Sequence, residues 1–265
     1  MRLLPELVSS YDNLEERIRN THQLGVGRLL LDLNKNRYEH LSVEEVINGL
    51  YFGVNDNLKY ELLPDAFLFH EQNLRRDILD KLLADTGISN SWTWITRHKS
   101  MRNFIEEIRG SQNTAEGELN ELIIYRNDAA HGALIDNFLG FNALLELCDF
   151  VESICQALAD LFTYKVIKQK EIIGKAKKFG KITEWFQKPQ AGVAKVADIS
   201  LTINSNLFLI KENIACCQSA VIQSIKIEDE SVDKIETTNE REIGLKFDVN
   251  AKSGLDLYML LGNGL

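Results

Sequence analysis

The chain has 265 residues, a formal net charge of −9, 45% hydrophobic residues and 26% charged residues. This mixture is typical of a soluble globular protein, and it excludes a disordered chain, a collagen-like repeat and a membrane protein. No apolar run approaches the ~18 residues needed to cross a bilayer. Acidic residues interrupt the N-terminus, where a signal peptide would need an apolar core, so we expect a cytoplasmic protein.

The N-terminal two-thirds of the chain is predicted to be helical, because apolar residues recur there at spacings of three and four. The first such stripe runs through residues 4–18. Ser42, with Glu45 three positions later, forms the capping box of a second helix. Further stripes follow within 74–82 and 101–108. Stripes of this kind form cores, so the pattern predicts a helical bundle.

The longest stripe belongs to a helix that we expect to end near Lys165. It is predicted to face the core of the bundle, and it consists of Leu144, Leu147, Cys148, Val151, Cys155, Leu158 and Phe162.

The character of the sequence changes near Glu171, where short β-branched or alternating segments replace the helical stripes. Such segments predict a small antiparallel barrel or sandwich. Helices followed by strands indicate a multidomain α and β protein, with a helical bundle over 1–168 and a β-barrel over 169–265. The predicted strands are Ile182–Phe186, Val193–Ile199, Leu207–Ile210, Ala220–Ile227 and Ile243–Val249.

The four cysteines show no C-x-x-C spacing, and the histidines show no metal-binding spacing. We therefore expect buried, reduced thiols and neither a metal nor a cofactor.

Seven lysines cluster between residues 165 and 181, and Glu171 is the only acidic residue among them. One interpretation, which we weight more heavily, is a solvated helix end and linker. The other is a contact for a polyanion, most simply RNA, with Lys175, Lys177 and Lys178 as candidates. The net negative charge of the chain excludes indiscriminate coating of nucleic acid but leaves room for such a local site.

Trp92 and Trp94 precede two further candidate RNA contacts, Arg97 and Arg102. The tryptophans could stack a base beside a phosphate contact. Tryptophans in this position more often brace the start of a helix, and both interpretations remain open.

Residues 113–132, NTAEGELNELIIYRNDAAHG, hold the strongest candidate site. Asn113 is typical of a helix start and Gly132 of a helix end. Arg126 falls on the apolar stripe of this helix, where an arginine is costly unless it is paired or serves a task. His131 lies about 140° from Arg126 around an ideal helix, whereas Asn127 and His131 share a face. A second copy of this helix across a two-fold axis would bring arginine, asparagine and histidine side chains together.

These residue types can cleave RNA without a metal. Histidine moves protons near neutral pH, arginine matches phosphate oxygens, and asparagine orients either partner. Arg17 and His22 have the same spacing, but we interpret that match as chance because no glycine follows His22.

The string LNELIIYRNDAAHG resembles the signature of HEPN-domain ribonucleases, and it is most similar to the RiboL-PSP-HEPN and MAE_28990-like branches. The resemblance covers roughly residues 1–165. It implies Arg126, Asn127 and His131 as catalytic residues, a homodimer formed through the helical domain, and metal-free RNA cleavage. It further implies a role as a toxin or an antiviral defence effector, with an antitoxin or defence-system partner. The lack of a long apolar run predicts no association with a membrane.

The C-terminal segments, beginning FGKITEWFQKPQAGVAKV, look like the β-barrel of translation factors, domain 2 of elongation factor Tu. The chain has no P-loop motif, so it is not a GTPase.

Two functions follow from this sequence. We favour a metal-independent endoribonuclease that leaves 2′,3′-cyclic phosphate ends on tRNA or other cellular RNA. The alternative is a non-catalytic HEPN scaffold that binds RNA or a protein associated with translation.

Overall fold

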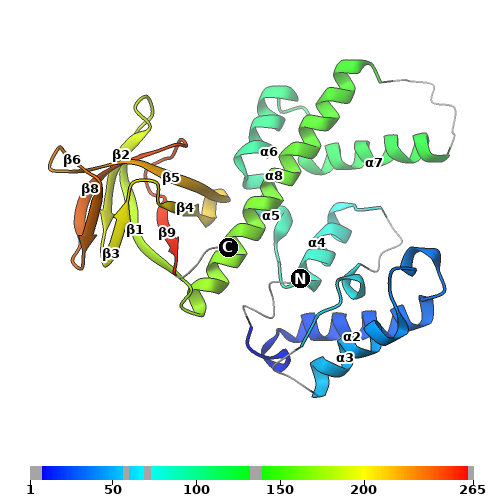
Figure 1. Cartoon of the computed structure of the whole chain (residues 1–265). Helices are drawn as coiled ribbons and strands as arrows, with labels where there is room; N and C mark the ends of the chain where they lie inside the picture. The colour runs from blue at the N-terminus through cyan, green and yellow to red at the C-terminus, as the bar shows by residue number, and fades with distance from the viewer. Residues whose placement is uncertain (1–7, 56–59, 69–72, 132–138, 262–265) are drawn as a thin grey trace. The chain divides into compact units, whose positions relative to one another are not determined.

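The structure is a computed structural model that describes residues 8–55, 60–68, 73–131 and 139–261. Within these residues seven α-helices precede nine strands, which confirms the predicted fold class (Figure 1). The helices are α2 (Glu16–Asp32), α3 (Val43–Asn55), α4 (Arg76–Asp85), α5 (Ser91–Arg97), α6 (Lys99–Asn103), α7 (Ala115–His131) and α8 (Phe141–Ile172). None of the described helices is long and apolar enough to cross a bilayer.

The residue contacts divide the chain into two units. Unit 1 comprises residues 1–93 and 109–147, and unit 2 comprises 94–108 and 148–265. The helices end at Ile172 and the first strand begins at Ala176. The predicted domain limits, 1–168 and 169–265, stay a prediction.

The core of unit 1 contains the first predicted stripe, but that stripe is not one helix. Within the described residues it forms a short 3-10 turn at Tyr11–Asn13, and α2 begins at Glu16. The break occurs because Leu14 has an extended backbone, with ψ of 147°. Tyr11, Leu14 and Ile18 are nevertheless all buried. The apolar spacing therefore correctly predicted that these residues are buried, but it incorrectly predicted that they belong to one helix.

The capping box at the start of α3 is confirmed. The Glu45 amide donates to Ser42 Oγ at 3.1 Å, and the Ser42 amide donates back to Glu45 Oε2 at 2.8 Å. This reciprocal pair satisfies two helix-end donors and fixes where α3 begins.

The prediction that the apolar stripe from Leu144 to Phe162 on α8 faces the core is wrong. Leu144, Val151 and Phe162 are 40%, 42% and 43% exposed, and Cys148 and Cys155 are exposed as well. The helix has 32 residues and carries two apolar stripes, of which the other is packed. The buried stripe consists of Phe150, Ser153, Ala157, Leu161, Tyr164 and Ile167. As a result, α8 presents a long apolar face to solvent.

The cysteines also differ in exposure. Cys217 is buried and Cys216 is half-buried, so the expectation of buried thiols fails only for the two on α8. All four thiols are free.

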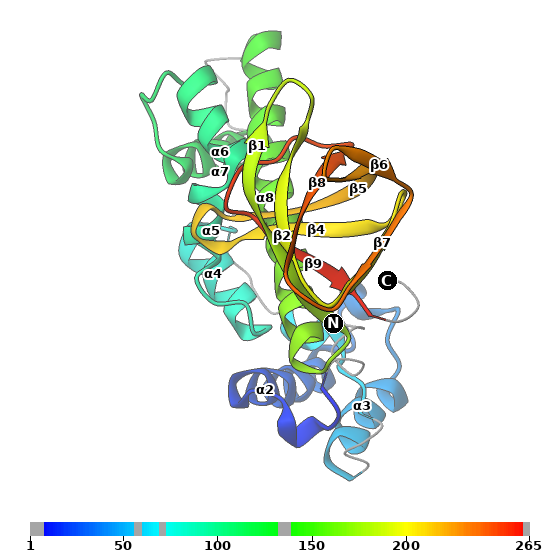
Figure 2. The same ribbon diagram turned by 90° about the vertical axis from the view of Figure 1, so that its left-hand side faces the viewer.

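The strands form a closed barrel (Figure 2). Six antiparallel strands follow the order β4-β9-β1-β2-β8-β5, and pairing of β4 with β5 closes the ring. β6 extends from β5, and β3 pairs with β7. Closure removes the exposed strand edges that a sandwich would leave. The strands are β1 (Ala176–Phe186), β2 (Ala191–Val196), β3 (Ile199–Thr202), β4 (Asn206–Lys211), β5 (Cys216–Ile227), β6 (Glu230–Val232), β7 (Lys234–Thr237), β8 (Arg241–Phe247) and β9 (Asp256–Leu260).

Two local features shape the barrel. The predicted strand Val193–Ile199 is split into β2 and β3, because Asp198 adopts a left-handed backbone with φ of 50°. Gly180 lies at a bulge in β1, where a Cβ atom would stand 2.4 Å from the carbonyl oxygen of Lys195. Only glycine fits this close approach of two strands.

Candidate functional site

The candidate site lies on α7, whose start is one residue later than predicted. Thr114 caps the helix, with its Oγ1 accepting from the Gly117 amide at 3.1 Å. Asn113 instead accepts from the Thr114 amide at 2.8 Å and donates to Glu118 Oε1 at 2.8 Å. This network orders the turn that leads into the helix.

A partly buried ion cluster, Arg109–Glu118–Glu146, anchors the first turns of α7. Glu118 is only 1% exposed, and its Oε1 lies 2.9 Å from Arg109 Nε. Arg109 also pairs with Glu146 on α8. Burial alone would lower the pKa of Arg109, but the two carboxylates raise it above its ordinary value. The sequence analysis missed this cluster, although a glutamate at an apolar-stripe position was a usable signal.

The structure brings Arg126 and Asn127 together on the exposed half of α7. Arg126 Nη1 donates to Asn127 Oδ1 at 3.0 Å and to Asn73 Oδ1 at 3.4 Å. Arg126 is exposed and Asn127 is half-buried. Arg126 therefore does not face the interior of the bundle, because the buried part of the stripe ends at Ile123. The contact with Asn73 was not foreseen.

His131 is the last residue of α7. Its side chain, and Gly132 as a whole, lie outside the described residues. The helical register places His131 one turn after Asn127, on the same face of an ideal helix.

The second Arg-x4-His match has a different environment. His22 is fully buried, with Nδ1 3.0 Å from Tyr11 Oη and Nε2 accepting from the Leu63 amide at 3.2 Å. Burial lowers the pKa of His22 to about 4. Arg17 instead pairs with Asp85 at 2.8 Å. This match is a core histidine and an ion pair between an exposed arginine and a buried aspartate, not a site.

Two of the three candidate lysines are already paired with acidic residues. Lys177 pairs with Asp198, and Lys178 pairs with Asp256 at 2.7 Å. The interpretation that Glu171 alone opposes this cluster is therefore wrong, because folding brings acidic residues of the barrel beside it. Lys175 is exposed.

The tryptophans brace the fold. Trp92 and Trp94 are both buried, and Trp94 stacks on Tyr164 with ring centroids 5.0 Å apart. Base stacking on them is excluded. Arg97 and Arg102 are exposed.

The sequence profile of the RiboL-PSP-HEPN family matches residues 4–164, more than half of the chain and all of the α7 segment. The chain belongs to the RiboL-PSP-HEPN family. Membership supports an RNA-related function of the HEPN type.

Other comparisons add little. No curated protein matches the chain. One solved structure that it resembles is the C-terminal domain of a proposed U32 peptidase from Geobacillus thermoleovorans, in its selenomethionine form. The identity is 11%, the match covers 31% of this chain and 96% of that one, and the TM-score is 0.27. This likeness carries no argument, so the resemblance to domain 2 of elongation factor Tu stays a prediction with which the closed barrel is compatible.

Proposed function

We propose that this HEPN protein is a metal-independent endoribonuclease that acts as a homodimer in the cytoplasm and serves as a toxin or antiviral defence effector. One observation carries the proposal: Arg126 is exposed on α7 and is held by Asn127 at 3.0 Å, inside the segment that the family profile matches. His131, one turn further on, supplies the titratable ring.

The reaction needs a base, a charge stabiliser and an acid. His131 of one copy removes the proton from a ribose 2′-hydroxyl, and the 2′-oxygen attacks the adjacent phosphorus. Arg126 stabilises the negative charge that develops on the phosphate oxygens. The bond from phosphorus to the 5′-oxygen breaks, and the second His131 protonates that oxygen. The products are a 2′,3′-cyclic phosphate and a 5′-hydroxyl.

Asn127 is a positioning residue in this scheme. Its Oδ1 accepts from Arg126, and so does Asn73 Oδ1. Both contacts use Nη1 of the guanidinium. The remaining donors of the guanidinium can then bind phosphate.

The exposed apolar surface of the helices supports a dimer. The last two turns of α7 are open, since Ile124 is 54% exposed and Ala129 and Ala130 are exposed. The unpacked stripe of α8, which includes Val151 and Phe162, is a second such surface. Burying apolar surface favours association.

The test is incubation of the purified chain with tRNA in the presence of a chelator. Cleavage that leaves cyclic phosphate ends, and that Arg126→Ala abolishes, is the expected result. Asp128→Ala is the matched control, because Asp128 is an exposed neighbour on the same turn. Intact RNA together with salt-dependent binding would instead support the alternative, a non-catalytic RNA- or protein-binding module. An antitoxin or other defence partner would be sought by co-purification.

A further inference from the structure

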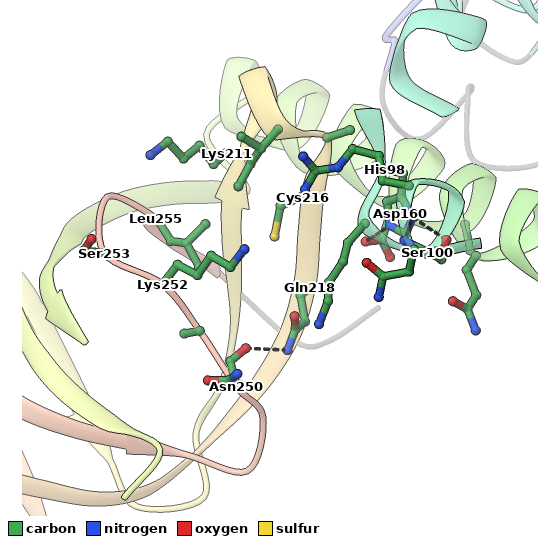
Figure 3. A pocket seen from close by; sticks show the side chains of 18 residues that line it. His98, Ser100, Asp160, Lys211, Cys216, Gln218, Asn250, Lys252, Ser253 and Leu255 are labelled. Atoms are coloured by element: carbon green, nitrogen blue, oxygen red, sulfur yellow. Dashed lines mark hydrogen bonds and ion pairs between the residues drawn. The ribbon is translucent and has the colours of Figure 1, made fainter. Parts of the chain in front are cut away.

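Unit 2 contains a cavity of about 820 Å³ that no residue of α7 lines. Its lining comes from His98 and α6, from α8, from the β4–β5 hairpin and from the loop before β9, all within unit 2 (Figure 3). Pockets of about 300–1,000 Å³ are typical of sites for small molecules.

A hydrogen-bonded array fixes the helical wall of this cavity. His98 Nε2 lies 3.1 Å from Asp160 Oδ2 on α8, and His98 Nδ1 accepts from the Ser100 amide at 3.3 Å. The His98 ring thereby connects the start of α6 to Asp160 on α8. The carboxylate of Asp160 is thereby engaged within the wall.

The cavity is strongly cationic. Lys99, Arg102, Lys211 and Lys252 line it, against one carboxylate, so the charge of its lining is 4 − 1 = +3 in a chain of −9. No ion pair involves any of these four cations within the described residues. Lys177 and Lys178, elsewhere in the same unit, are by contrast paired. Like charges gathered without partners favour an anionic ligand.

Two of the cations, Lys211 and Lys252, lie on the barrel side of the cavity. Lys211 Nζ lies 2.7 Å from the position that a Cβ atom of Gly254 would occupy, so its ammonium rests against the loop that carries Lys252. Lys252 points from that loop towards Cys216 on β5 (Figure 3). Burial raises the pKa of the Cys216 thiol to about 11, Asp160 also raises it, and Lys252 and Lys99 lower it. Such a thiol is protonated at neutral pH, so the cavity is suited to binding and not to cysteine chemistry.

The lining contains no phenylalanine, tyrosine or tryptophan to stack a base. Its apolar part is small and aliphatic, and it includes Ile214 and Leu255. Guanidinium and ammonium groups match phosphate oxygens. We propose that this cavity is a phosphate-binding site for a ligand with two or more phosphate groups, supplied by an RNA backbone or by a free nucleotide. The RNA source rests on the proposed function, whereas the nucleotide source does not.

The experiment measures binding of a labelled oligouridylate, and separately of ATP, to the full chain. The chain carries Arg126→Ala so that RNA stays intact. Lys211→Gln with Lys252→Gln removes two pocket cations. Lys188→Gln with Lys226→Gln is the control, because it removes the same charge from exposed positions of the barrel outside the pocket. We expect the pocket pair to weaken binding about tenfold or more. For RNA, the slope of log K against log salt should fall by about 1.4, since each phosphate contact contributes about 0.7.

The outcomes separate the two sources. Loss of RNA binding in the pocket variant alone identifies the RNA backbone, and loss of ATP binding alone identifies a free nucleotide. Equal loss in the control, or no binding of either probe, overturns the site. If the wild-type chain cuts no RNA but the Arg126→Ala chain binds a probe through the pocket, the proposed function is refuted and the site is retained. If the wild-type chain cuts RNA but the variant with Lys211→Gln and Lys252→Gln binds both probes normally, the site is refuted and the proposed function is retained.

Discussion

Replacing Arg109 by alanine should strongly destabilise unit 1, because it would leave the Glu118 carboxylate buried with one amide partner. Glu118 is 1% exposed, whereas the Arg109 side chain is 23% exposed. Removing one partner of a buried ion pair costs about 3–5 kcal/mol. Partial access of water at Arg109 favours the lower end, about 3 kcal/mol. That is a large share of a total stability of about 5–15 kcal/mol.

The assay is thermal unfolding followed by the helical signal in far-ultraviolet circular dichroism. A loss of about 3 kcal/mol corresponds to a fall in Tm of roughly 10 °C for a unit of this size. Arg76→Ala is the matched control, because Arg76 pairs with Glu116 on the same first turn of α7 at 2.8 Å, in solvent. Its Tm should hardly change, since exposed pairs contribute little. Adding Glu118→Gln to Arg109→Ala should recover part of the loss. Equal shifts in both arginine variants, or no recovery, would refute this reasoning.

Three further predictions concern pH, packing and thiol access. The pKa of His22 is about 4 when folded and 6.5 when free, so acid protonates the unfolded chain first. The contribution of His22 to the free energy of unfolding should therefore be fully present above pH 6.5 and should fall by about 3 kcal/mol towards pH 4. Chemical unfolding of His22→Gln should lack this part of the loss. Gly180→Ala should destabilise the barrel by about 1–3 kcal/mol through overpacking against a backbone carbonyl of β2; Gly27→Ala, which meets nothing within 4 Å, should not destabilise the chain in the same unfolding assay. A maleimide should label Cys155 rapidly in the native chain and Cys217 only after unfolding, as mass spectrometry would show; protection of Cys155 that grows with protein concentration would indicate that a dimer covers α8.

Local signals in the sequence predicted local structure well. The capping box at Ser42 depends on residues three apart, and the barrel strands depend on alternation within a few residues. The stripe of α8 misled because two apolar stripes on one long helix look alike in sequence. Only the packing of other segments decides which of them is buried.

The site was predictable in part for the same reason. Arg126 and Asn127 are adjacent, so their contact needs no knowledge of the fold. Asn73 is 53 residues away in sequence from Arg126, and the barrel carboxylates that neutralise Lys177 and Lys178 are also distant in sequence. Contacts of this kind are set by tertiary structure, which periodicity does not report.

The central claim is that Arg126 and His131 cleave RNA without a metal. A map of cleavage sites on cellular RNA, made with excess chelator, tests it most directly. The account predicts breaks with 2′,3′-cyclic phosphate ends, and a rate at least about a hundredfold lower in His131→Ala, as expected for loss of a general acid or base. Cleavage that the chelator stops, or that persists at the same sites in His131→Ala, would contradict it.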